Sequence, residues 1–245
     1  WCPTLSSNEP TPLQRCLPPE PGCLLALRDA TRRAGAPLGF DEAVTGVRLA
    51  LGGAQAAIQL VPRLMVPGTA KVLAPTYNEH AAALRAQGWT VCEVSTLPEL
   101  AGADLAIVVN PNNPDGRRWR PEELGAPADT TGLLVVDESF ADPKPEASLA
   151  PTLQHYGERV LVLRSFGKFY GLAGLRLGFA LGGPHTIATL RELAGPWAVN
   201  GPAIAVATRA LADTDWQART RKRLRAAAQR LDAFALSRGW ALVGG

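Results

Sequence analysis

The chain has 245 residues, of which 47% are hydrophobic and 19% are charged, and its formal net charge is +3. This balance is typical of a globular protein and excludes disordered and fibrous classes, while so small a net charge gives no reason to expect a nucleic-acid partner. No apolar run reaches the roughly 20 residues of a membrane span, and the N-terminus lacks a basic segment followed by an apolar one. We therefore expect a soluble cytoplasmic protein.

The first 40 residues contain seven prolines, which exclude long regular elements and predict an arm lying over another surface. From there, short apolar runs rich in β-branched residues alternate with helical stretches. This alternation predicts an α/β fold, with a mostly parallel sheet and helices on both faces. The expected strands are 71–75, 90–94, 104–109, 133–137, 160–163 and 177–181, and the expected helices are 56–64, 77–87 and 187–194.

A long helical stretch rich in alanine and arginine follows Pro202, is interrupted at Thr214 and ends near Ser237. Its basic run, 219–225, is expected to be a solvated helix face. The residues 240–243 then predict one more strand, and a strand with nothing after it suggests a fragment of a longer protein. We accordingly expect an arm at 1–40, a large domain at 41–200, and a linking helix with the start of a truncated small domain at 201–245.

Cysteine and histidine spacing predicts no metal site. The cysteines form no Cys-x-x-Cys pair; three fall within the first 23 residues, so a local disulfide stays open beside the simpler assumption of reduced thiols. The histidines are scattered, and we expect them to be surface or capping residues. The cysteines are Cys2, Cys16, Cys23 and Cys92, and the histidines are His80, His155 and His185.

Candidate functional residues follow the predicted strands, because ligands of open α/β sheets bind beyond the carboxyl ends of the strands. Strand 133–137 ends in Asp137 and Glu138, carboxylates that need donors or cations if they are buried. Strand 104–109 leads into a tight turn at 110–116 that presents amides. Two glycines precede helix 56–64, so the N–H groups at its start are free to bind an anion such as phosphate.

Lys168 is one of only four lysines in the chain, and it alone follows a strand between two glycines, Gly167 and Gly171. Glycines allow a sharp turn and the close approach of a ligand. An amine can condense with a carbonyl group and a guanidinium cannot, which would explain a lysine in an arginine-rich chain. Taken alone, the same pattern is also typical of a surface lysine in a glycine-bearing loop.

Three segments together resemble the signature of fold-type I aminotransferases. They are Asn-Pro-Asn-Asn-Pro-Asp-Gly at 110–116, Val-Val-Asp-Glu-Ser-Phe at 135–140 and Ser-Phe-Gly-Lys-Phe-Tyr-Gly-Leu-Ala-Gly-Leu-Arg-Leu-Gly at 165–178. The resemblance runs from 52 to 178 and is closest to the subgroup of histidinol-phosphate aminotransferase and the cobalamin-pathway threonine-phosphate decarboxylase. It implies pyridoxal 5′-phosphate as cofactor, a sheet of the seven-stranded type, a homodimer and a small phosphorylated amino acid as substrate.

The resemblance also implies roles for individual residues. Lys168 would hold the cofactor covalently and, once displaced by substrate, act as general acid and base. Asp137 would keep the pyridine nitrogen protonated, so that the ring draws electrons from the substrate. Asn113 would donate to the phenolic oxygen of the ring, and Tyr77 would stack on its face. The cofactor phosphate would be bound by Ser165, Arg176 and the backbone of Ala54 and Gln55.

Phe140 departs from the subgroup's aminotransferases, which usually carry a tyrosine there whose hydroxyl reaches the cofactor. Phenylalanine at 140, together with the segment 145–151, looks more like the threonine-phosphate decarboxylases, although a neutral packing substitution stays open. The predicted function is therefore decarboxylation of L-threonine O-3-phosphate to aminopropanol phosphate in cobalamin biosynthesis. The alternatives are a histidinol-phosphate-type aminotransferase and, from another class, a catalytically impaired binding domain of the same fold.

Overall fold

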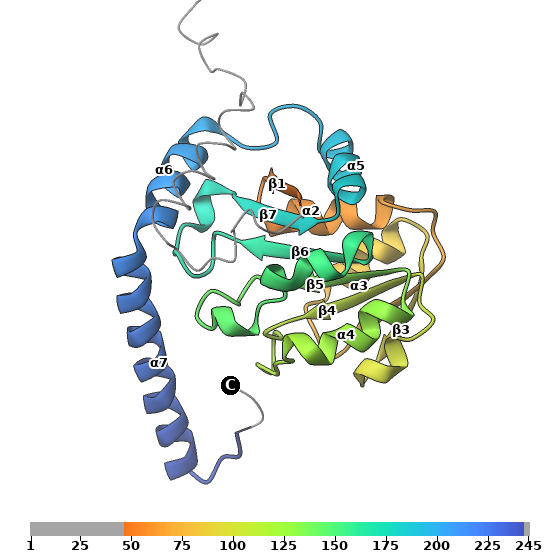
Figure 1. Ribbon diagram of the computed structural model, residues 1–245. Coiled ribbons are helices and arrows are strands. Elements are labelled where there is room, and N and C mark those ends of the chain that lie inside the picture. The colour runs from red at the N-terminus through yellow and green to blue at the C-terminus, as the bar shows by residue number, and fades with distance from the viewer. Residues whose placement is uncertain (1–46, 243–245) are drawn as a thin grey trace, which may run out of the picture.

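The computed structural model of the protein describes residues 47–242, which form a seven-stranded sheet in the order β1-β7-β6-β5-β4-β2-β3 (Figure 1). β7 runs antiparallel to its neighbours β1 and β6, and all other neighbouring strands are parallel. The strands are β1 (Val47–Leu51), β2 (Thr69–Leu73), β3 (Thr90–Val94), β4 (Leu105–Val109), β5 (Leu133–Asp137), β6 (Val160–Ser165) and β7 (Gly178–Gly182). The predicted mostly parallel sheet is confirmed, and the predicted arm at 1–40 lies outside the described residues.

Helices cover both faces of the sheet, as the alternating pattern predicts. On one face, α2 (Ala54–Leu60), α3 (Glu79–Ala86) and α5 (Pro184–Ala194) contribute to one apolar cluster; on the other, α4 (Pro121–Thr130) and α6 (Gly201–Ala212) contribute to a second, with the start of α7 (Thr214–Ser237). Short 3₁₀ helices complete the chain at Val61–Arg63, Leu97–Leu100, Pro145–Ala147, Ala150–His155, Gly157–Arg159 and Ala173–Leu175. None of the described helices is both long enough and apolar enough to cross a membrane.

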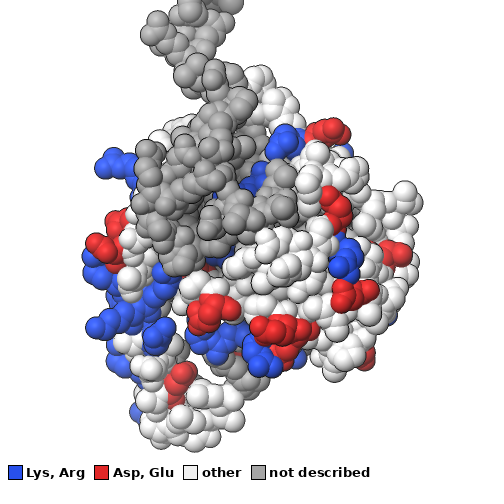
Figure 2. Space-filling model, in the orientation of Figure 1, with Lys and Arg blue, Asp and Glu red and all other residues white. Residues whose placement is uncertain are grey.

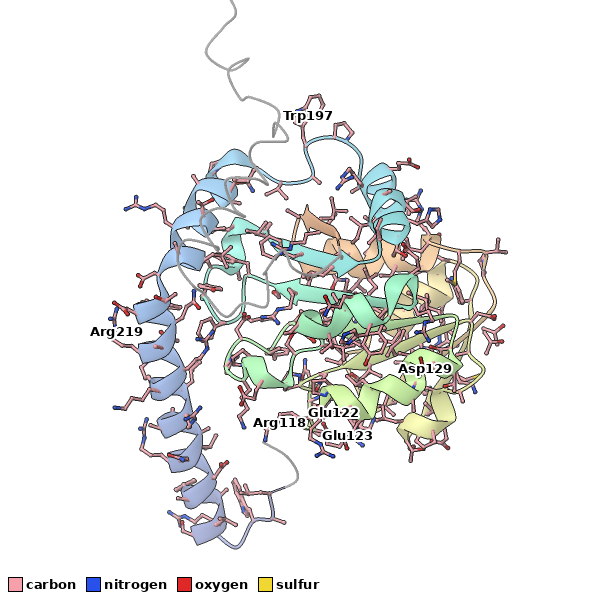
Figure 3. The ribbon with its side chains drawn as sticks, viewed as in Figure 1. Arg118, Glu122, Glu123, Asp129, Trp197 and Arg219 are labelled. Atoms are coloured by element: carbon pink, nitrogen blue, oxygen red, sulfur yellow. The ribbon has the colours of Figure 1, made fainter. Side chains whose placement is uncertain are left out.

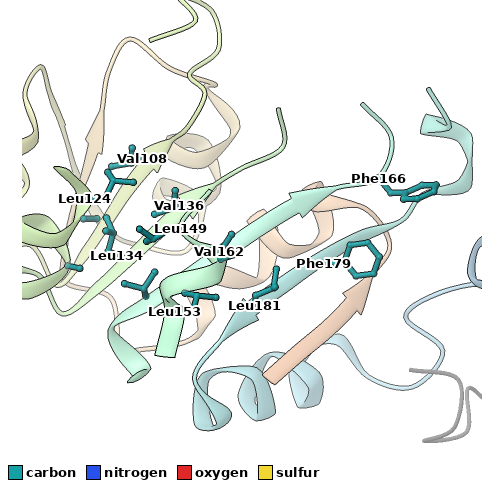
Figure 4. Packing of buried hydrophobic residues seen from close by; sticks show 14 of the residues in the cluster. Val108, Leu124, Leu134, Val136, Leu149, Leu153, Val162, Phe166, Phe179 and Leu181 are labelled. Carbon is teal, nitrogen blue, oxygen red and sulfur yellow. The ribbon is translucent and has the colours of Figure 1, made fainter. Parts of the chain in front are cut away.

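The central strands β4 and β5 are buried along their whole length because both of their faces are covered. Successive side chains of a strand point to opposite faces, so Leu134 and Val136 pack in one cluster, and Leu133 and Val135 pack in the other. Figure 4 shows the first cluster, in which residues of β4, β5, β6 and β7 meet Leu124 of α4. This is why continuous apolar runs, rather than alternating ones, mark these strands in the sequence.

Several sequence predictions can be compared with the described residues. The break at Thr214 is confirmed, because α6 ends at Ala212 and the Asp213 side chain caps α7 by accepting from Trp216 N. The strand predicted at 240–243 is wrong over 240–242: these residues are irregular, since no described strand lies beside them to pair with their backbone. β1 was not among the predicted strands.

The basic run of α7 is a solvated face, as predicted, with one exception. Arg219, Lys222, Arg223 and Arg225 are exposed, and Figure 2 shows Lys and Arg side chains gathering along this helix. Arg219 points outward from α7 (Figure 3). Arg221 is half-buried instead, and its Nε donates to the carbonyl oxygen of Asp142 at 2.8 Å.

Leu134 gives a test of the core. Leu134→Ala removes a fully buried side chain between the sheet and its helices, so we expect it to lower the free energy of unfolding by about 3 kcal/mol. Leu231→Ala on α7 is the matched control, because Leu231 is 68% exposed and should change that free energy by less than about 0.5 kcal/mol. Urea unfolding followed by circular dichroism measures both, and equal losses would contradict this description of the core.

Candidate active site

A pocket of ≈ 260 Å³ lies at the carboxyl ends of the parallel strands. Val109, Asp137 and Ser165, which line it, are the last residues of β4, β5 and β6. These strands are parallel neighbours, so their ends meet at one edge of the sheet. The pocket brings together all eight residues predicted for the site, namely Ala54, Gln55, Tyr77, Asn113, Asp137, Ser165, Lys168 and Arg176.

Asp137 is a buried carboxylate with a nearly complete set of donors. Its Oδ1 accepts from the Ser139 N–H at 2.9 Å and from the Ser139 hydroxyl at 2.6 Å, and its Oδ2 lies 2.9 Å from His80 Nε2. Burial acts to raise the pKa of Asp137, but the hydrogen bonds and charge of His80 and the donors of Ser139 outweigh it and lower that pKa. The pocket therefore contains a charged acid at neutral pH.

His80 corrects the prediction that the three histidines are surface or capping residues. His155 and His185 are exposed, but His80 on α3 is only 2% exposed. Because the Asp137 carboxylate is charged, it accepts the hydrogen bond and His80 Nε2 carries the proton. No local spacing in the sequence indicates this contact, because the partner of His80 lies 57 residues away.

Tyr77 lines the pocket and meets the ring of His80 edge-on, with the ring centroids 6.3 Å apart. Its hydroxyl lies 3.4 Å from Gln55 Oε1, and Gln55 Nε2 donates to Glu79 Oε2 at 3.0 Å. Partial burial, with the charges of Glu79 and Asp137, raises the pKa of Tyr77, so its hydroxyl stays neutral and remains a donor. The side chain of Gln55 thus links α2 to α3 and contacts the Tyr77 hydroxyl, a role that the sequence did not indicate.

Asn113 reaches the pocket because its neighbour Asn112 anchors the turn. Asn112 is buried: its Nδ2 donates to Pro75 O and to Asp115 Oδ1, and its Oδ1 accepts from the Thr76 hydroxyl at 2.6 Å. Asn113 has no hydrogen bond to any residue in 47–242, so its amide is available to a ligand.

The start of α2 forms a second polar wall. Gly53 begins this helix with φ 94° and offers no capping side chain, so the N–H groups of Ala54 and Gln55 have no acceptor among the described residues and lie at the pocket. Gly178 permits this approach, because a Cβ there would lie 2.4 Å from Ala54 N. Arg176 adds a guanidinium beside Gly53, on a left-handed backbone with φ 52°. Uncapped N–H groups and a guanidinium suit an anion such as phosphate.

Lys168 lines the same pocket from the turn after β6. Its side chain is exposed, and its Nζ lies 5.3 Å from the centre of the Phe140 ring. Within residues 47–242 its Nζ has no hydrogen bond and no ion pair. A lysine amine at the pocket wall with no competing carboxylate partner is accessible to an electrophilic ligand.

Glu138 does not line the pocket, and its carboxylate belongs to a buried ion cluster with Arg164 and Asp142. Arg164 Nη1 donates to Glu138 Oε2 at 2.9 Å, and its Nη2 donates to Asp142 Oδ1 at 2.6 Å. Burial raises the pKa of Glu138, although Arg164, Ser148 and the Leu149 N–H act against this. Glu138, one of the two carboxylates expected to need donors or a cation if buried, is therefore paired with Arg164.

The His80 contact predicts a pH-dependent stability difference. In the folded protein the pKa of Asp137 is below its unfolded value of about 3.9, so its contribution is present above that pH and is lost as pH falls through the folded pKa. His80→Leu should lower the free energy of unfolding by about 2 kcal/mol at pH 7 and by less at pH 3.5.

Urea unfolding at both pH values measures the difference, with His80→Gln as the control that keeps an N–H donor. If His80→Leu lowers the free energy of unfolding by the same amount at both pH values, the lowered pKa of Asp137 does not depend on His80.

Comparisons with known proteins bear on this site. A family model described as "Aminotransferase class I and II" matches residues 42–244. A threonine-phosphate decarboxylase of Pseudomonas aeruginosa is 48% identical over 204 residues, covering 80% of this chain and 61% of the relative. Another from Sinorhizobium sp is 44% identical over 176 residues, covering 69% and 52%. The chain thus spans roughly half to three-fifths of the length of these relatives.

Among solved structures, histidinol-phosphate aminotransferase from Sinorhizobium meliloti in complex with pyridoxal-5′-phosphate superposes with a TM-score of 0.75 at 24% identity. The match covers 91% of this chain and 69% of that one, and it confirms the fold. Because the family model covers most of the chain, and the three sequence segments lie inside it, this chain belongs to the class I and II aminotransferase family.

Proposed function

We propose that the whole protein is a pyridoxal 5′-phosphate-dependent lyase that decarboxylates L-threonine O-3-phosphate to aminopropanol phosphate in cobalamin biosynthesis. The observation that carries the proposal is the pocket itself, where an accessible amine, a buried charged acid and uncapped N–H groups lie within one volume of ≈ 260 Å³. The two relatives named above, both threonine-phosphate decarboxylases, support the choice of reaction.

The donor set of the pocket fits the cofactor. The uncapped N–H groups of Ala54 and Gln55, with Ser165 and Arg176, would hold its phosphate. Asn113, whose amide is unpaired among the described residues, would donate to its phenolic oxygen. Asp137 would accept from the pyridine N–H, because the donors of Ser139 and His80 keep its carboxylate charged.

When bound, the cofactor draws electrons from the bonds at the substrate's α-carbon. Lys168 would hold the cofactor through its amine and, once freed by the substrate, deliver the proton that replaces the lost carboxylate. Tyr77 would cover the cofactor ring and exclude water from that side, and the contact of its hydroxyl with Gln55 ties its side chain to α2. Asp137 would keep the ring charged throughout.

Phe140 supports decarboxylation over transamination. It lines the pocket beside Lys168 and has no hydroxyl to offer to the cofactor. The Lys168 ammonium instead lies near the face of an aromatic ring, a contact worth about 0.5–1 kcal/mol at exposed sites. Histidinol-phosphate aminotransferase activity is the second candidate, since a protein of that name from Baumannia cicadellinicola is 31% identical over 180 residues.

We also propose a cytoplasmic homodimer that completes its sites between subunits. In its domain organisation, 41–200 would form the cofactor-binding large domain, and 201–245 would link it to a smaller one. The continuous sheet and its helices over 47–194 support the first boundary, and the long helix α7 supports the second.

Covalent attachment of the cofactor gives one prediction. Mixing the chain with pyridoxal 5′-phosphate should give a yellow absorption band that borohydride bleaches, and peptide mapping should locate the reduced adduct on Lys168. Lys168→Ala should abolish the band, whereas Lys222→Ala should not, because Lys222 lies on α7, which lines no part of the pocket. An adduct retained in Lys168→Ala would show that another lysine holds the cofactor. Absence of an adduct in the unchanged chain would favour an impaired binding domain.

The reaction itself gives another prediction. The whole protein should release carbon dioxide from L-threonine O-3-phosphate and form aminopropanol phosphate, while histidinol phosphate with 2-oxoglutarate should give no glutamate. Lys168→Ala should lower the rate at least about 10³-fold, because it removes both the attachment point and the proton donor. Transamination without release of carbon dioxide would rule out the decarboxylase and favour the aminotransferase.

A further inference from the structure

The turn that carries Lys168 is exposed on its pocket side and packed against other residues on its opposite side. On the pocket side the Lys168 side chain is exposed. The turn's own backbone is compact: Gly171 N donates to Lys168 O at 3.1 Å, and a Cβ on Gly167 would lie 3.0 Å from Ala173 Cα. What fixes the direction of Lys168 must therefore include the side chains on the opposite side of the turn.

Those side chains are aromatic, and they stack on α7. The rings of Phe166 and Tyr170 are parallel to within 11° with centroids 4.4 Å apart, and Tyr170 stacks in turn on Trp216 at 5.6 Å and 12°. Phe169, the residue after Lys168, meets Trp216 edge-on at 5.5 Å. Trp216 thus contacts both residues that follow Lys168.

α7 is itself firmly placed at this point. Gln217 is fully buried, and its Nε2 donates to Leu211 O at the end of α6. One turn later, the guanidinium of Arg221 lies 5.5 Å from the centre of the Phe169 ring while its Nε donates to Asp142 O. The first turns of α7 are therefore a fixed support, although the helix is mostly exposed from Lys222 onward.

We propose that Trp216 is a positioning residue for Lys168, which acts through Phe169 and Tyr170 to aim the amine into the pocket. The inference rests on the proposed function, in which Lys168 holds the cofactor. It adds that the aim of this amine is set by α7, an element that lines no part of the pocket.

Ring contact, and not hydrogen bonding, carries this positioning. The Tyr170 hydroxyl is buried and has no hydrogen-bond partner among the described residues. Burial also raises the pKa of Tyr170, so the hydroxyl is neutral and contributes no charge to the turn. Tyr170→Phe therefore removes the hydroxyl while keeping the stack, and it is the matched control for Trp216→Leu, which removes the stack.

The first readout needs no cofactor. Reductive methylation with ¹³C-formaldehyde labels the four lysines and the N-terminal amine, and Lys168→Arg assigns the Lys168 signal. In Trp216→Leu the Lys168 methyl signal should narrow and move toward its position in the unfolded chain, because the turn gains motion. In Tyr170→Phe it should not change.

The second readout is the equilibrium for forming the covalent adduct with pyridoxal 5′-phosphate. Trp216 makes two ring contacts with the turn, so their loss should weaken the adduct roughly tenfold. Trp89→Leu controls for general destabilisation, because Trp89 is 4% exposed in the cluster on the other face of the sheet and should leave the adduct within about twofold. Arg221→Met, which keeps Trp216, should weaken it less than Trp216→Leu.

The outcomes separate this inference from the proposed function. An unchanged Lys168 signal in Trp216→Leu, or an equal loss in Trp89→Leu, would overturn the positioning role while leaving the function intact. A narrowed signal in a protein that forms no adduct would uphold the positioning role and overturn the function. Should Trp216→Leu fail to fold, Trp216→Phe, which keeps one ring but loses part of the contact with Phe169 and Tyr170, is measured by the same signal with the same two outcomes.

Discussion

The electrostatics of the pocket depend on keeping one buried carboxylate, Asp137, charged. Removing the Asp137 side chain from water favours its protonated form, and three donors reverse this preference: the Ser139 N–H, the Ser139 hydroxyl and His80 Nε2. Two of them come from the same turn and cost little to arrange, but His80 comes from α3, across the sheet edge. The position of α3 on β2 is therefore part of the electrostatics of the pocket.

The period of a strand separates two acids that stand next to each other in the sequence. Asp137 faces the pocket and Glu138 faces Arg164, because consecutive side chains at the end of β5 point to opposite sides. Arg164 also binds Asp142, so one guanidinium is shared by two carboxylates, neither of which lines the pocket. Each acid has its own donors, and the two sites can differ in protonation.

Much of this arrangement could be predicted from the sequence, because strands buried on both faces, such as β4 and β5, appear as continuous apolar runs and their last residues mark the ligand edge. β1 was missed because Arg48 interrupts its apolar run. The strand expected at 240–243 failed over its described part because apolar content alone supplies no pairing partner. His80 was missed for a related reason: its partner is 57 residues away, and only the folded chain brings the two together.

The same limit applies to Lys168, whose glycine-flanked turn is visible in the sequence while its support is not. Phe166, Phe169 and Tyr170 appear in the sequence as ordinary apolar residues, and Trp216 lies 46 positions beyond Tyr170. A flexible amine on a glycine-rich turn loses conformational freedom when it engages a ligand, and a rigid stack behind the turn removes part of that loss in advance. The glycines allow the backbone of the turn to bend, and the packing of the aromatic rings of Phe169 and Tyr170 on Trp216 of α7 keeps that conformation rigid.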